Sequence, residues 1–303
     1  MATAAEFLDD QLTRTFAPQP IVRLEVVRIG APLAILGFLS TRIAHAADWL
    51  STAGFHPPPM PGDYRQPVSW APLEPWQAYV VCTVLVIAGL MTIAGAFTRW
   101  SSGIFALTLA YVALADRLAT FTVSKLAPII AIAICASQAG ERWSVDAWRK
   151  RRRNPKYVAP RFVSGGSVRF FQLMVPIFYF ASGYLKAKAD WLKTPYVLWT
   201  QLHDSYQTWV SWEFANHFPT WAWPVMQATT LAFEIGAPLW FGLKWTRPYA
   251  FAYGVAMHLL IGVMFGPVAW FAMLMIVLLV AGYAPITWLD PHWDQSSVAP
   301  QRK

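Results

Sequence analysis

The sequence predicts an all-α integral membrane protein, a bundle of about eight transmembrane helices with both termini in the cytoplasm. Three observations predict this fold class: the composition, the apolar segments and the placement of the basic residues. Of the 303 residues, 56% are hydrophobic and 13% are charged, whereas soluble domains carry about 25% charged residues. This composition excludes a water-soluble enzyme and a disordered chain, and two cysteines are too few for a disulfide scaffold.

Eight apolar segments are bounded by charged, proline or turn residues, and most approach the roughly 20 residues that a helix needs to cross a bilayer core. They cover residues 22–46, 75–97, 101–116, 120–139, 167–188, 223–243, 248–264 and 267–285. The third is short, and only Gly266 and Pro267 separate the last two. We therefore expect a cytoplasmic segment over 1–19, a transmembrane domain over 20–286 and a cytoplasmic tail over 287–303.

The first segment is expected to anchor the chain, because the residues before it are partly acidic and lack the apolar run of a cleavable signal peptide. The densest group of Lys and Arg lies between the fourth and fifth segments, from Arg142 to Arg169. Short basic loops stay in the cytoplasm, so an even number of spans places both termini inside. The net charge of +8 thus follows from topology, and we expect no nucleic-acid partner. The other cytoplasmic positions then hold Arg14, Arg23, Arg99, Lys244, Arg247, Arg302 and Lys303.

Two long outer connections, about 47–74 and 189–222, are rich in Trp, Tyr and Pro. Their aromatic residues either anchor the protein at the level of the lipid headgroups or form a half-buried lid over an outward-facing cavity. No internal repeat is evident, which disfavours a secondary transporter, since many of those folds are built from repeats.

Ionisable residues inside the first and fifth segments are candidate site residues, because a charge in lipid requires a partner or water. Glu25 lies three residues before Arg28, so the two share one helix face. Arg28 is either part of a structural ion pair, a side chain that extends to the inner interface, or a substrate-binding residue. Lys186 and Asp190 are four residues apart and can pair. Lys186 either extends to the outer interface or is a desolvated base active at neutral pH.

Two further candidates lie deep inside later segments. Glu234 is too far from either end of its segment to reach the interface, so it requires a hydrogen-bond partner or a proton. His258 lies on a segment that Gly254 and Gly262 allow to pack closely, as a core residue or as a functional one. No HxxxH, HExxH or CxxC spacing is present, so we expect no metal site.

Three local motifs resemble those of one family. These are VVRIGAPL around Arg28, ERWSVDAW at 141–148 and YFASGYLKAKADW at 179–191, accompanied by Glu234 and by MHLLIGVMFG around His258. The chain resembles the HTTM family, the transmembrane domain of vitamin K-dependent gamma-glutamyl carboxylase and its bacterial relatives. The resemblance covers about 20 to 285, which is nearly the whole chain.

The resemblance implies a lysine base, and counting back from the ADW motif places Lys186 at that position. The family chemistry deprotonates a reduced naphthoquinone, adds oxygen, and uses the strong base formed to abstract a proton from a glutamate, which then takes up carbon dioxide. A reduced quinone, menaquinol or vitamin K hydroquinone, is thus the implied cofactor. Asp190 is expected to orient Lys186, Glu234 to brace it or accept a proton, and His258 to line the pocket or act as an acid. Substrate-binding roles are expected for Tyr184, Trp191 and Arg28.

The sequence departs from the carboxylases in the fourth segment, where they carry a DKxxxNNHSY motif with a catalytic histidine. An ungapped count places Val123 at that histidine and Lys125 at the tyrosine, while Asp116 and Ser124 are retained. The sequence also has no counterpart of the large lumenal domain that binds the protein substrate, so full carboxylation of a docked protein is not expected.

Two hypotheses follow. The first is an enzyme of the bacterial inner (plasma) membrane that acts on a quinol or similar apolar substrate in an outward-facing pocket. The second is a non-catalytic membrane maturation or assembly factor. Expected partners are membrane lipid, a quinone, and a protein substrate or partner on the outer side.

Overall fold

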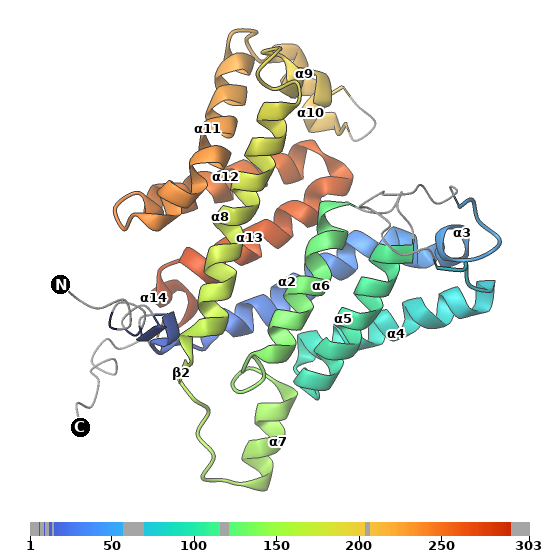
Figure 1. Ribbon diagram of the computed structural model, residues 1–303, viewed down its shortest axis with the longest axis vertical. Helices are drawn as coiled ribbons and strands as arrows, with labels where there is room; N and C mark the ends of the chain where they lie inside the picture. Colours follow the sequence, from blue (N-terminus) through green and yellow to red (C-terminus); the bar gives the residue numbers. More distant parts are fainter. Residues whose placement is uncertain are drawn as a thin grey trace.

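The computed structural model describes residues 6, 9, 12–13, 15–56, 70–115, 121–203 and 207–291. Over these residues the protein is all-α, apart from one two-stranded antiparallel sheet in which Gln19 lies opposite Val163 (Figure 1). Its strands are β1 (Gln19–Pro20) and β2 (Phe162–Val163). Asp116 and the end of the C-terminal tail lie outside the described residues.

Each of the eight predicted segments corresponds to a long helix. These are α2 (Val22–Ala44), α4 (Pro75–Ala94), α5 (Thr98–Ala115), α6 (Thr122–Ala136), α8 (Gly165–Lys188), α11 (Ala222–Gly242), α12 (Arg247–Met264) and α13 (Ala269–Tyr283). Shorter helices lie between them, namely α3 (Ala46–Leu50), α7 (Val145–Arg153), α9 (Val197–Gln201), α10 (Trp209–His217) and the 3-10 turn η1 (Gly266–Val268), and α14 (Ile286–Leu289) follows the last of them. The all-α prediction is confirmed. Among the described helices, α4 and α8 are long and apolar enough by themselves to cross a membrane.

The long helices form two groups of four (Figure 1). In the first group α2, α4, α5 and α6 pack in a ring, each against the next, and α6 closes back on α2. In the second group α8, α11, α12 and α13 pack in a ring in the same way. The two rings meet mainly where α2 packs along α13. The chain therefore forms two closed groups of four helices, and we call the contact between them along α2 and α13 the seam.

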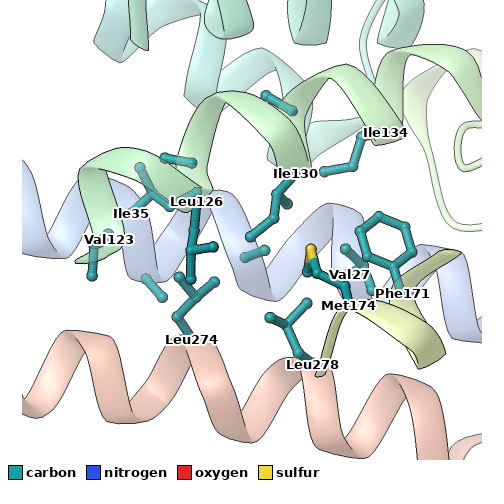
Figure 2. Packing of buried hydrophobic residues seen from close by; sticks show 14 of the residues in the cluster. Val27, Ile35, Val123, Leu126, Ile130, Ile134, Phe171, Met174, Leu274 and Leu278 are labelled. Atoms are coloured by element: carbon teal, nitrogen blue, oxygen red, sulfur yellow. The ribbon is translucent and has the colours of Figure 1, made fainter. Parts of the chain in front are cut away.

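An apolar core fills the seam between the two groups (Figure 2). It contains side chains from both rings: Val27, Ile35, Val123, Leu126, Ile130, Ile134, Phe171, Met174, Leu274 and Leu278. Val123 is 1% exposed and packs near Ile35 and Leu126. The position that the ungapped count aligned with the catalytic histidine is thus filled here by a core residue.

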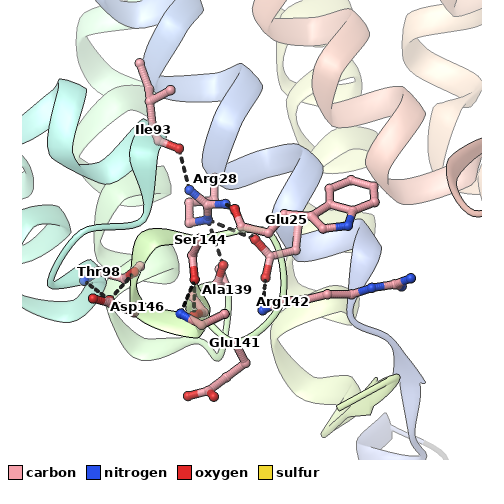
Figure 3. Close-up of polar contacts among 12 residues, drawn as sticks. Glu25, Arg28, Ile93, Thr98, Ala139, Glu141, Arg142, Ser144 and Asp146 are labelled. Carbon is pink, nitrogen blue, oxygen red and sulfur yellow. Dashed lines mark hydrogen bonds and ion pairs between the residues drawn. The ribbon is translucent and has the colours of Figure 1, made fainter. Parts of the chain in front are cut away.

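Arg28 connects three parts of the first group at the end near α7 (Figure 3). Its side chain is fully buried and donates to Glu25 Oε2 at 2.8 and 3.0 Å. It also donates to the carbonyl oxygens of Thr92 at 3.0 Å and Ala139 at 2.7 Å, and to those of Ile93 and Trp143. Protein acceptors surround the guanidinium. Of the three roles considered for Arg28, this geometry therefore matches the structural ion pair.

The ERWSVDAW motif holds the turn between α4 and α5 against α7. Asp146 accepts hydrogen bonds at 2.8 Å from the backbone N–H groups of Phe97 and Thr98 and from the Thr98 hydroxyl, which caps the start of α5. Gly95 adopts a φ of +66°, and a Cβ there would lie 2.3 Å from the Cβ of Ser144. The turn therefore requires glycine for both its conformation and its close packing.

We predict that Arg28→Ala lowers the free energy of unfolding by about 3–5 kcal/mol, because it leaves the Glu25 carboxylate buried and unpaired. Thermal unfolding of the purified, detergent-solubilised protein measures the effect. Arg151→Ala, which removes an exposed arginine of α7, is the matched control and should change stability little. Equal losses in the two variants would contradict the bracing role.

Candidate functional site

Lys186 and Glu234 form an ion pair where α8 and α11 approach each other closely. The Nζ atom of Lys186 donates to Glu234 Oε1 at 2.5 Å. One turn earlier, a Cβ on Gly183 would lie 2.8 Å from Glu234 Cβ and 2.9 Å from the backbone nitrogen of Ile235. Glycine at 183 thus allows the approach that lets the pair form. The carboxylate is the more buried partner, with side-chain exposures of 6% for Glu234 and 29% for Lys186.

Trp191 covers the other side of the lysine. Its ring centroid lies 4.7 Å from Lys186 Nζ, which is a cation–π contact, and the residue is 8% exposed. Gln227 on α11 fixes this segment: its Nε2 donates to the carbonyl oxygens of Trp191 at 2.7 Å and Thr194 at 2.6 Å, and its Oε1 accepts from the backbone N–H of Val197 at 2.9 Å. The chain after α8 is therefore folded back over the ion pair.

A second polar pair, Tyr179 and His258, lies in the interior of the same ring. His258 Nε2 on α12 is 2.8 Å from the Tyr179 hydroxyl on α8. Aromatic rings enclose both residues: Phe233 and Phe241 contact Tyr179, and Phe271 contacts His258. His258 is 2% exposed and Tyr179 is 3% exposed, so the pair is buried among aromatic rings.

Two polar atoms of this site have no hydrogen-bond partner among the described residues. They are Glu234 Oε2 and His258 Nδ1, and both are buried. An unsatisfied buried polar group costs about 1–3 kcal/mol, and more if it is charged. Each atom is therefore a place where a bound polar group would gain a hydrogen bond without losing one within the protein.

A family model, described as the HTTM domain, matches residues 16–288 of this chain. The chain belongs to the HTTM family. This family is membrane-associated, and the matched range includes all eight long helices and the Lys186 site. No curated protein and no solved structure matches the chain.

The expected pairing of Lys186 with Asp190 is wrong in this HTTM domain. Asp190 pairs instead with Lys193 at 3.1 Å, and both side chains are about 70% exposed. The reason is that α8 ends at Lys188, so the helical spacing that would place Asp190 below Lys186 does not continue. Glu234, which the sequence marked as in need of a partner, pairs with Lys186.

The three residues expected to bind substrate lie in different places. Trp191 contacts Lys186. Tyr184 is 47% exposed, stacks with Phe180 and contacts the Lys188 ammonium. Arg28 belongs to the first helix group and is enclosed by the acceptors described above. The site of this HTTM domain therefore combines Lys186, Glu234, His258 and Trp191, while Tyr184 and Arg28 lie apart from it.

Sequence reasoning missed Tyr179 and Gln227. Tyr179 was one of several aromatic residues in its segment, and no local pattern distinguishes it from its neighbours. Gln227 did carry a signal, because a lone amide in an apolar segment requires buried partners just as a charge does. Among the described residues, no group of three or more His, Cys, Asp or Glu is arranged to hold a metal ion.

We predict strong coupling between Lys186 and Glu234 in a double-mutant cycle. Lys186→Met should lower the unfolding midpoint by leaving the Glu234 carboxylate unpaired, and adding Glu234→Leu should restore part of the loss, with a coupling of about 0.5–3 kcal/mol. The cycle Lys193→Met with Asp190→Leu is the control and should give about 0–1 kcal/mol, because that pair is exposed. Additive effects at Lys186 and Glu234 would exclude the ion pair.

Proposed function

We propose that this HTTM protein is an integral enzyme of the bacterial inner membrane that acts on a quinol or a similar apolar substrate with an ionisable hydroxyl. One observation carries the proposal: the half-buried Lys186–Glu234 pair lies in the same helical ring as a cluster of aromatic rings and two buried polar atoms that have no partner among the described residues. A general base requires a proton-accepting atom, a substrate position beside it and little water.

The proposed topology has eight spanning helices with both termini in the cytoplasm. Its first support is the large apolar side chains that remain exposed on the long helices, among them Ile87, Leu107 and Leu173. In water such surface is unfavourable, whereas lipid covers it without cost. Its second support is charge: the basic helix α7 follows α6 and precedes the start of α8, whereas Lys186 lies near the end of α8. The α7 side then faces the cytoplasm and the Lys186 side faces outward.

A reduced quinone fits the groups of this site. It supplies a flat aromatic ring with two hydroxyl groups and two reducing equivalents. The aromatic side chains around Tyr179 suit a flat ring, and Glu234 Oε2 and His258 Nδ1 are two atoms free to hydrogen-bond. We assign Trp191 to covering Lys186 and His258 to hydrogen bonding with the substrate.

Lys186 is proposed to be the base, with Glu234 as its partner in proton transfer. As an ion pair, Lys186 is protonated and its nitrogen cannot accept a proton. If the proton moves along the 2.5 Å hydrogen bond to Glu234 Oε1, both side chains become neutral and the Nζ lone pair is freed. Lys186 Nζ then accepts the hydroxyl proton, the O–H bond breaks, and the resulting ammonium stabilises the oxyanion. Glu234 thus takes the positioning role that the sequence had assigned to Asp190.

A non-catalytic maturation or assembly factor is the second candidate. Val123 favours it, because the residue at the aligned position of the carboxylase histidine is an apolar core residue. An exposed apolar groove of about 520 Å³ between α4 and α5, lined by residues such as Ile87 and Trp100, also favours it. Such a groove suits contact with lipid or with a partner in the membrane.

The deciding experiment incubates purified protein in lipid with reduced menaquinone and oxygen and analyses the quinone by mass spectrometry. We expect an oxygenated product whose rate of formation falls about 10²–10⁴-fold in Lys186→Ala. The rate should fall by a similar factor in Lys186→Arg, because arginine stays protonated and cannot act as a base. Lys193→Ala, which removes an exposed lysine nearby, is the control and should keep the rate. Product formation that is unchanged in Lys186→Ala would exclude the base, and no product from folded wild type would favour the second candidate.

The topology is tested separately. Green fluorescent protein fused after Lys303 should fluoresce, and alkaline phosphatase fused at the same residue should be inactive, because each reporter works on only one side of the inner membrane. Phosphatase fused within the connection between α8 and α11, for example after Lys193, should be active. An active phosphatase after Lys303 would overturn the proposed orientation.

A further inference from the structure

A crevice of about 690 Å³ lies at the opposite end of α8 from Lys186. It opens between α6 of the first helix group and the start of α8 of the second, and Leu24 of α2, Arg99 of α5, Phe16 and Val163 complete its wall. The two groups pack along α2 and α13, but α6 and α8 contact each other only slightly. The crevice thus lies where the two helix groups do not pack against each other. Its volume lies within the roughly 300–1,000 Å³ of typical ligand sites.

One part of the crevice is apolar and open at its side. Ile129 and Ile132 of α6 and Phe170 of α8 line it, and all three are exposed by more than 40%. Leu24 of α2 lies at its base. This surface suits a hydrocarbon chain that enters sideways from the membrane.

The other part of the crevice is polar and basic. Arg99 lines it together with Gln138, Ser164 and Ser167, and none of its lining residues is acidic. Within the part of the chain that the structure describes, the Arg99 side chain has no ion pair or hydrogen-bond partner. Ser164 precedes α8 and its side chain makes no capping hydrogen bond, and Gly166 and Ser167 of the first turn of α8 also line this end. The charge and the donors together match a phosphate or another anion.

We propose that this crevice binds an anionic phospholipid. The headgroup phosphate is held by Arg99, Ser164 and Ser167, and one acyl chain lies along Ile129, Ile132 and Phe170. An anionic lipid is the occupant that matches both ends, because a soluble anion leaves the apolar wall uncovered and an uncharged apolar molecule leaves Arg99 unpaired. This inference uses the membrane placement proposed above and is independent of the chemistry at Lys186.

Native mass spectrometry of the full-length protein in detergent tests the proposal, with phosphatidylglycerol and phosphatidylcholine of identical acyl chains titrated in parallel. Wild type should bind one phosphatidylglycerol about fivefold or more tightly than phosphatidylcholine, since one basic side chain near the headgroup contributes about that factor. Arg99→Gln should remove this preference. Arg151→Gln, which removes an exposed arginine outside the crevice, should retain it.

A second variant tests the apolar wall without altering charge. Ala136→Phe places a ring at an exposed position of the crevice and should weaken the binding of both lipids. Ala228→Phe, at an exposed position of α11, should leave the binding of both unchanged. Equal affinity for the two lipids, equal loss in Arg99→Gln and Arg151→Gln, or displacement of the lipid by millimolar inorganic phosphate would each overturn the proposal. The quinone assay is unaffected by these outcomes, so the two proposals fail separately.

Discussion

The buried guanidinium of Arg28 is the interaction on which the first helix group depends. A buried arginine without acceptors would be strongly unfavourable, so the chain must bring acceptors to it from several directions. Here they are Glu25 on the same helix and carbonyl oxygens from the end of α4 and from the segment between α6 and α7. Because helix ends leave carbonyl groups without intrahelical partners, one arginine satisfies several of them at once. Arg28 thus joins α2, the end of α4 and the segment between α6 and α7, while the apolar core packs the seam to the second group.

The second group contains the opposite situation. Lys186 is paired on one side by Glu234 and covered on the other by Trp191, yet within the described ranges the second carboxylate oxygen of Glu234 and one nitrogen of His258 have no hydrogen-bond partner. Complete satisfaction is typical of a brace, whereas incomplete satisfaction inside a dry aromatic interior is typical of a site that receives another molecule. Both ion pairs consist of one basic side chain and one glutamate. Arg28–Glu25, with its other acceptors, has a structural role, whereas Lys186–Glu234 belongs to the candidate functional site.

The sequence predicted the helices well and the contacts between them poorly, for physical reasons. Apolar runs of about 20 residues have few alternatives to helices, so all eight segments were placed. Helices as short as α7 and α10 were not predicted, since their charged or aromatic residues resemble those of loops. Burial of Glu234 followed from its depth in an apolar segment, but the identity of its partner depends on which helices adjoin. That choice is made by Gly183 and by the end of α8 at Lys188, and neither is visible in residue spacing alone.

The division into two rings has a consequence for biosynthesis. Every acceptor of Arg28 lies between Glu25 and Trp143, so the first ring can be completed while the second is still being synthesised. The residues of the candidate site, from Tyr179 to His258, emerge only afterwards, and α13, which joins the rings, emerges last of the long helices. The first helix group can therefore fold before the residues of the candidate site are synthesised, and Lys186 and Glu234 can pair beside a helix group that is already formed.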